Sequence, residues 1–144
     1  MNKFNLKNKT AIITGGAQGF GFDIAKRFLS SGAKVIIWDI DKKQLIKCSK
    51  EIDNKNLSFN VVDVSKFSNV KKIVNKISKN SKIDILINNA GITGPTASLW
   101  DYDVKKWEKI MEINLLGTFY CCKCIVPIMI KNNYGRIVNV ASVA

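Results

Sequence analysis

The sequence predicts an α/β domain built on an open, doubly wound parallel sheet. Short segments rich in Val and Ile alternate with longer segments of helical period, in the order β-α-β-α-β-α-β-α-β. The strand segments are apolar nearly throughout, as in parallel strands that helices cover on both faces. With right-handed crossovers, we predict five strands in the order 3-2-1-4-5. The 144 residues suit one domain, predicted over residues 1–144.

The expected strands are short apolar runs, at residues 11–13, 35–38, 57–62, 83–87 and 137–140. Helices are expected between them, at residues 20–30, 41–51, 67–78 and 103–131. The first helix ends at a Ser-Gly stop signal, and the second begins with Asp41 three residues before Gln44, which resembles a capping box. Pro127 is expected to bend or end the last helix.

Composition and charge exclude several classes of function. Histidine is absent, so no imidazole base, triad or imidazole metal ligand is available. The net charge is +12, but the lysines are spread over several separate segments, without an Arg cluster. We therefore predict no nucleic-acid partner, and we keep a basic interaction protein only as a third hypothesis.

Segments that contact or cross membranes, or that bind metals, are not expected either. No continuous apolar run approaches 18 residues, and the first ten residues are too polar for a signal peptide. This predicts a cytoplasmic protein with no membrane partner. Cys121 and Cys124 form a C-x-x-C pair inside an apolar run, where we expect core packing and no metal site.

A glycine-rich loop follows the first predicted strand and opens the first helix, with the sequence Thr-Gly-Gly-Ala-Gln-Gly-Phe-Gly at residues 14–21. Gly15 suits the tight turn, Gly19 allows the backbone to approach a pyrophosphate, and Gly21 allows close helix packing. The helix N-terminus then offers free N–H groups to the phosphates. The loop predicts a dinucleotide site.

The spacing Thr-Gly-x-x-x-Gly-x-Gly resembles the motif of the short-chain dehydrogenase/reductase family. Further motifs occur in that family's order: Asp63-Val64, Asn-Asn-Ala-Gly at 88–91, Asn114, and the segment 135–142. The resemblance implies a Rossmann fold and hydride transfer between a nicotinamide cofactor and a secondary alcohol or ketone. The most similar branches are 3-oxoacyl-carrier-protein reductases and sugar or polyol dehydrogenases, which are usually homo-oligomers.

Asp39 ends the second strand, where a carboxylate accepts hydrogen bonds from the adenosine ribose of NAD and repels the extra phosphate of NADP. No Arg adjoins it and Gln18 is neutral, so NAD is the expected cofactor. The resemblance implies that Asp63 and Val64 border the adenine and that Asn89 and Gly91 line the cleft. The complete expected cofactor set is Gly15, Gln18, Gly19, Phe20, Gly21, Asp39, Asp63, Val64, Asn89 and Gly91.

For catalysis, the resemblance implies that Ser142 binds the substrate oxygen and that Asn114 holds a water of the proton relay. The family's Tyr-x-x-x-Lys pair follows the serine and does not occur there in this sequence. Tyr102 and Lys106 have that spacing but precede Asn114, so we do not expect them to be the acid/base pair. We thus expect an N-terminal, cofactor-binding part that lacks the C-terminal strands and is inactive alone; the alternative is a catalytically silent dinucleotide-binding module.

Overall fold

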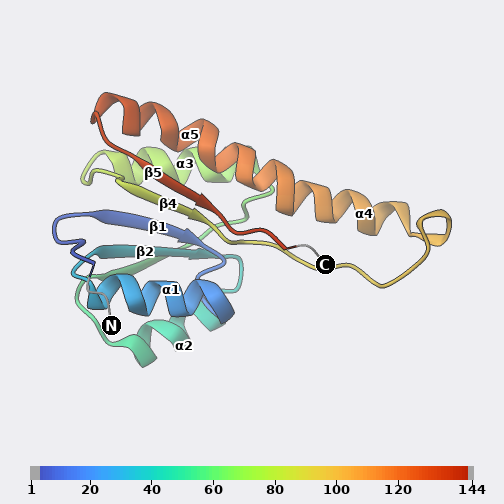
Figure 1. Ribbon diagram of the computed structural model, residues 1–144, viewed down its shortest axis with the longest axis horizontal. Coiled ribbons are helices and arrows are strands. Elements are labelled where there is room, and N and C mark those ends of the chain that lie inside the picture. Colours follow the sequence, from blue (N-terminus) through green and yellow to red (C-terminus); the bar gives the residue numbers. More distant parts are fainter. Residues whose placement is uncertain (1–3, 143–144) are drawn as a thin grey trace.

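A computed structural model describes residues 4–142 and has one five-stranded parallel sheet (Figure 1). The strand order is β3-β2-β1-β4-β5, which confirms the predicted topology. The strands are β1 (Thr10–Thr14), β2 (Lys34–Asp39), β3 (Leu57–Val61), β4 (Ile85–Asn88) and β5 (Arg136–Asn139). Because the order reverses beside β1, the loops after β1 and β4 diverge and leave a crevice at the carboxyl ends of the strands.

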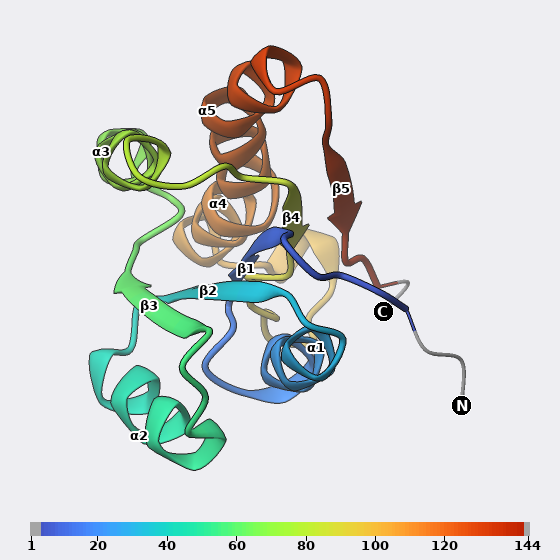
Figure 2. The same cartoon turned by 90° about the vertical axis from the view of Figure 1, so that its left-hand side faces the viewer.

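Helices cover the sheet on both faces, with α1 and α2 on one side and α3 and α5 on the other (Figure 2), whereas α4 continues the line of α5 beyond the ends of the strands (Figure 1). Their bounds are α1 (Gly19–Ser30), α2 (Lys42–Ile52), α3 (Phe67–Ser78), α4 (Val104–Met111) and α5 (Gly117–Lys131). A short 3-10 turn, η1 (Leu99–Asp101), precedes α4. A π-helical segment, η2 (Glu112–Leu116), joins α4 to α5.

The core has two halves, because successive side chains of a strand point to opposite faces. On β1, Ala11 and Ile13 pack with the α1 and α2 side, whereas Ile12 packs with the α3 and α5 side. All three are fully buried. Both faces of this almost entirely apolar strand are therefore packed against helices, as the sequence predicts.

The predicted last helix corresponds to the continuous run from α4 through η2 to α5, 28 residues in length. Pro127 lies inside α5 and does not end it. Of the two expectations for Pro127, that it bends or that it ends the helix, the second is therefore wrong. Pro127 and Lys123 both lie on the exposed side, where the Lys123 carbonyl that lacks its helical N–H partner can face water.

This helical run also has the length and composition of a membrane span. The prediction concerned continuous apolar runs only. Asn114, Thr118 and Lys123 interrupt the segment 113–130 without making it polar on average, so the prediction did not register this helix. A core helix passes the same test, and here Cys121, Ile125 and Met129 are buried against the sheet and α3.

β5 forms one edge of the sheet and pairs with β4. All four of its residues are exposed, among them Ile137 and Val138, at 39% and 51%. Figure 2 shows α1 beneath β1 and β4, and no described helix beneath β5. Within the described residues, β5 is therefore a sheet edge that no helix covers on this face.

The cysteines lie in or beside the core. Cys48 and Cys121 are buried, and Cys122 and Cys124 are partly exposed. Burial, followed by the neighbouring thiols Cys122 and Cys124, raises the pKa of Cys121 from 9.0 to about 12. Residues 4–142 contain no group of three acidic, Cys or His side chains placed to hold a metal ion.

Gly21 brings the first turn of α1 close to the glycine loop and to the turn after β4. A Cβ on this residue would collide with the Gly15 carbonyl oxygen and lie 2.6 Å from Asn89 Nδ2. Gly19 differs, because its φ is +55° while a Cβ added to it would have no neighbouring atom within 4 Å. The two glycines therefore serve different needs, close packing at Gly21 and backbone conformation at Gly19.

Replacing Gly21→Ala should lower the free energy of unfolding by about 2–3 kcal/mol, since the methyl group overpacks a backbone carbonyl. Gly19→Ala is the matched control and should cost about 1 kcal/mol, the penalty for a left-handed backbone alone. Urea unfolding followed by circular dichroism measures both. An equal or smaller cost at Gly21 would contradict the close-packing role.

Cys121 should resist alkylation at pH 8 at least tenfold longer than Cys124, because it is buried and the thiolate is the reacting form. Its raised pKa also makes the folded state retain a proton that the unfolded chain loses above about pH 9. Stability should therefore decline between about pH 9 and 12. Iodoacetamide labelling followed by peptide mass spectrometry measures how fast each thiol reacts. In denaturant, as the control, Cys121 and Cys124 should react at equal rates.

Candidate functional site

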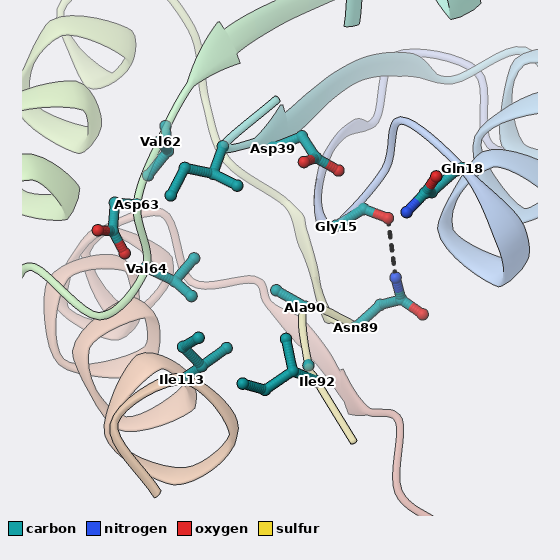
Figure 3. Close-up of a pocket in the computed structure, with 12 residues that line it drawn as sticks. Gly15, Gln18, Asp39, Val62, Asp63, Val64, Asn89, Ala90, Ile92 and Ile113 are labelled. Carbon is teal, nitrogen blue, oxygen red and sulfur yellow. Dashed lines mark hydrogen bonds between the residues drawn. The ribbon is translucent and has the colours of Figure 1, made fainter. Parts of the chain in front are cut away.

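A pocket of about 320 Å³ lies at the carboxyl ends of the strands, between the loops that follow β1, β2, β3 and β4 (Figure 3). It is lined by Gly15, Gln18, Asp39, Ile40, Val62, Asp63, Val64, Asn89, Ala90, Gly91, Ile92 and Ile113. Asp39 and Asp63 are the only charged residues in this lining set. The pocket thus occupies the topological switch point, where ligands of doubly wound sheets bind.

The loops after β1 and β4 are joined by hydrogen bonds that centre on two side chains. The Thr14 hydroxyl accepts from the backbone N–H groups of Asn89 (3.0 Å) and Ala90 (2.9 Å). Asn89 Nδ2 in turn donates to the carbonyl oxygens of Thr14 (3.0 Å) and Gly15 (3.1 Å). These bonds fix the glycine loop relative to the Asn-Asn-Ala-Gly turn and hold one wall of the pocket.

The Asp39 carboxylate is held by two backbone amides. Oδ2 accepts from Ala17 N at 3.3 Å and Oδ1 accepts from Asp41 N at 3.1 Å. Gln44 supports the same arrangement, since its Nε2 donates to the Ala17 carbonyl at 3.4 Å. Of the predicted capping box, only the bond from Gln44 N to Asp41 Oδ1 (3.0 Å) forms. The remaining polar groups of Gln44 and Asp41 instead position the glycine loop and Asp39.

The glycine loop leads into an α1 N-terminus that no described side chain caps. By contrast, Asp41 caps α2 and Asp103 caps α4. Gly15 and Gly19 both have positive φ, +62° and +55°, and the space around Gly19 is open. The first N–H groups of α1 therefore have no carbonyl partner within the helix and lie beside the open space at Gly19, which suits an anion.

The turn after β3 brings Asp63 and Val64 to the side of the pocket nearest α3 (Figure 3). Asp63 Oδ1 accepts from the Ser65 hydroxyl at 2.6 Å and from Ser65 N at 3.0 Å. Asp63 N donates to Asn69 Oδ1 at 2.8 Å. Asp63 is thereby oriented by its own turn, and Val64 contributes a buried apolar surface.

Asn114 lies in the π-helical segment η2 and is bonded to the backbone of Ile92 at two points. Its Oδ1 accepts from Ile92 N at 2.9 Å, and its Nδ2 donates to Ile92 O at 3.0 Å. Asn114 Oδ1 also lies near the place where Gly91 would carry a Cβ. In this structure the Asn114 side chain positions the loop after β4, which forms part of the pocket wall.

Ser142 is exposed and lies three residues beyond the end of β5. β5 is aligned with β4 by a hydrogen bond from Asn88 Nδ2 to Asn139 Oδ1 at 2.9 Å. Tyr102 lies elsewhere: its ring packs edge-on against Trp107 at 5.4 Å, and its hydroxyl adjoins Gly94. Tyr102 and Lys106 do not line the pocket.

Seven of the predicted site residues therefore line the pocket: Gly15, Gln18, Asp39, Asp63, Val64, Asn89 and Gly91. Gly19, Phe20 and Gly21 lie in the first turn of α1, and Asn114 and Ser142 are outside the lining set. Sequence reasoning missed the positioning roles of Thr14 and Gln44 and every apolar lining residue except Val64, namely Ile40, Val62, Ala90, Ile92 and Ile113. The signal for Ile40 and Val62 was available, because each adjoins a predicted acidic residue at a strand end.

Comparison with known proteins agrees with this geometry. The family model described as short chain dehydrogenase matches residues 9–144. The 2-dehydro-3-deoxy-L-rhamnonate dehydrogenase (NAD(+)) of a Sphingomonas species is 41% identical over 137 residues, which are 94% of this chain and 54% of that protein. The 3-oxoacyl-(acyl-carrier-protein) reductase FabG of Chlamydia muridarum is 37% identical over 96% of this chain and 57% of its own length.

Solved structures show the same relationship. NAD+-bound xylitol dehydrogenase superimposes with a TM-score of 0.91 at 31% identity, over 95% of this chain and 54% of the other. Serine dehydrogenase from Escherichia coli gives a TM-score of 0.87 at 29% identity, over 92% and 62%. The chain thus spans about half the length of the curated relatives it matches. Because the family model covers nearly the whole sequence, the chain belongs to the short-chain dehydrogenase family.

Proposed function

We propose that this chain binds NAD in the pocket at the switch point and supplies the cofactor-binding part of an oxidoreductase. The observation that carries the proposal is the fixed Asp39 carboxylate, which two backbone amides hold beside the uncapped N-terminus of α1. The hydroxyl groups of a ribose need a hydrogen-bond acceptor, and a pyrophosphate needs free N–H groups. Here the Asp39 carboxylate and the N–H groups of α1 lie on either side of one glycine loop.

The donor set of the pocket fits NAD along its length. The backbone of Gly15, Gln18 and Gly19, with Phe20 and Gly21 in the first helical turn, would hold the pyrophosphate. Asp39 would hold the adenosine ribose. Asp63 and Val64 would border the adenine, and Asn89 and Gly91 would line the path toward the nicotinamide. Once bound, the nicotinamide would accept or donate the hydride exchanged with a secondary alcohol or ketone.

NAD is proposed in preference to NADP because of the charge in the pocket. The lining set contains two carboxylates and no lysine or arginine, so nothing in it would neutralise an added phosphate on the ribose. The naming of the Sphingomonas relative as an NAD(+) enzyme and the NAD-bound form of the xylitol dehydrogenase support the same choice.

For catalysis we propose that Ser142 hydrogen-bonds the substrate oxygen. We also propose that Asn114 lies beside a water of the proton relay and acts as a positioning residue through its bonds to the loop at Ile92. The family's Tyr-x-x-x-Lys pair does not follow Ser142 in this sequence, so we expect this polypeptide to bind the cofactor without turnover. The second candidate is a catalytically silent dinucleotide-binding module, which the same pocket and glycine loop would serve. Residues 1–144 would then form one cytoplasmic domain, and homo-oligomers are expected only of the complete enzyme.

Asp39→Asn should weaken NAD binding about tenfold or more, since a charged hydrogen-bond acceptor for the ribose is lost. The same substitution should weaken NADP binding less, so the ratio of NAD affinity to NADP affinity should fall. Isothermal titration with each nucleotide measures the four affinities, and Asp23→Asn, an exposed acid on α1, is the control. A wild-type preference for NADP, or an unchanged NAD affinity in Asp39→Asn, would refute the assignment.

The polypeptide should show a higher Tm with saturating NAD but no measurable oxidation of xylitol or reduction of a β-ketoester. Ketone reduction that Tyr102→Phe abolishes would show that Tyr102 is the acid/base, contrary to its position here. Sequencing the gene beyond codon 144 separates the two candidates: an in-frame Tyr-x-x-x-Lys about a dozen codons after Ser142 supports the enzyme, and its absence supports the silent module.

A further inference from the structure

The first turn of α2 is joined to the glycine loop by the side chain of Gln44. Its Nε2 donates to the Ala17 carbonyl oxygen at 3.4 Å. Ala17 N in turn donates to Asp39 Oδ2 at 3.3 Å, so one residue of the loop contacts both side chains. Gln44 is partly buried, and the adjacent Leu45 is fully buried in the same core cluster as Ala17. The backbone of Gln44 is therefore anchored beside the glycine loop.

The same turn of α2 also reaches the other oxygen of the Asp39 carboxylate. Asp39 Oδ1 accepts from Asp41 N at 3.1 Å. In a complete capping box, the Gln44 side chain would accept from that N–H group. Here the Asp41 N–H is bonded to Asp39, and the Gln44 carboxamide is bonded to Ala17. Both carboxylate oxygens are thus held from the start of α2, one directly by Asp41 and the other through Gln44 and Ala17.

Ala17 lies between a part of the glycine loop that is fixed to the sheet and a part that is not. One residue before it, Gly16 N donates to a carbonyl oxygen of β2 at 3.1 Å. Two residues after it, Gly19 has open space around the position of a Cβ. Gln44 holds the Ala17 carbonyl, which restricts the rotation of the N–H group on the same Cα. Gln44 thereby orients the amide that holds Asp39 Oδ2.

We propose that Gln44 is a positioning residue that sets the preference of the pocket for NAD over NADP. Its role rests on the proposed function, because it concerns how Asp39 receives the adenosine ribose. The two amide bonds use one acceptor position on each carboxylate oxygen and leave another for a ribose hydroxyl. A carboxylate held at both oxygens does not rotate away, so an added phosphate on the ribose meets its full charge.

Loss of the Gln44 carboxamide should affect the two nucleotides differently. Asp39 would keep the bond to Asp41 N, but Oδ2 would lose its oriented amide and could turn toward water, since Asp39 is only partly buried. NAD would then lose an ordered acceptor. NADP would lose the same acceptor but would also be repelled less. A general loosening of the glycine loop would instead weaken both nucleotides alike, because both carry the same pyrophosphate.

Isothermal titration of the full chain with NAD and NADP tests the proposal, with displacement of NAD to measure a weak NADP affinity. Gln44→Met keeps the length of the side chain but removes the donor. It should weaken NAD binding about fivefold and change NADP binding by less than about twofold. Gln44→Ala should lower the ratio of NAD affinity to NADP affinity to the same extent. Asn75→Leu, which removes an exposed carboxamide from α3, is the control and should leave both affinities unchanged.

A double-mutant cycle shows whether Gln44 acts through Asp39. In the Asp39→Asn background, Gln44→Met should change NAD affinity by less than about twofold, because the charge that Gln44 positions is already gone. The full loss seen in the wild-type background would mean that Gln44 acts independently of Asp39. That result would overturn the proposal.

Circular dichroism and the Tm without nucleotide confirm that each variant is folded. Equal losses of NAD and NADP affinity in Gln44→Met would show a structural role alone and would also overturn the proposal. Unchanged NAD affinity in Gln44→Met, together with the expected loss in Asp39→Asn, would refute the role of Gln44 and leave the cofactor site standing. If the wild-type chain binds neither nucleotide, the proposed function fails, and the role of Gln44 fails with it.

Discussion

The candidate site depends on the hydrogen bonds between Thr14 and Asn89. The ladder that pairs β1 with β4 ends at Ile13 and Ile87, so beyond it the loops after the two strands need other contacts to fix their relative position. Thr14 provides one hydroxyl to two backbone amides of the opposite loop, and Asn89 returns two bonds to the β1 end. Gly21 then allows α1 to approach the same junction closely. Loop geometry, and with it the pocket, follows from this small set of contacts.

Electrostatics divides the molecule in two. The only charged residues that line the pocket are carboxylates, although the chain has a net charge of +12. For the proposed cofactor, the groups that would hold the phosphates in the pocket are therefore backbone N–H groups of the glycine loop and α1. The lysines lie outside the pocket, and residues 64–83 and 113–144 contain no Asp or Glu to offset them. The charged side chains of the pocket and those of these two segments are thus of opposite sign.

The sequence was sufficient for the topology because each strand is short, apolar and followed by a helix of clear period. It was also sufficient to place Asp39 and Gly15 at the pocket, because both follow directly on predicted strands. It could not reveal that Gln44 donates to Ala17 or that Asn114 is bonded to Ile92, since these pairs meet only after crossovers are closed. Likewise, Pro127 was a poor indicator of a helix end because its exposed setting leaves the freed carbonyl hydrated.

β5 has a consequence for any work on the isolated polypeptide. A parallel edge strand with Ile137, Val138 and Val140 exposed presents unpaired backbone groups together with apolar side chains. Such an edge is a template on which a second chain can add a strand, and native proteins normally block it with charge, proline or a covering helix. Here only Arg136 supplies charge within the strand. At high concentration, strand addition between copies would compete with the monomer, so solubility would be limited by this edge even if the rest of the domain is well packed.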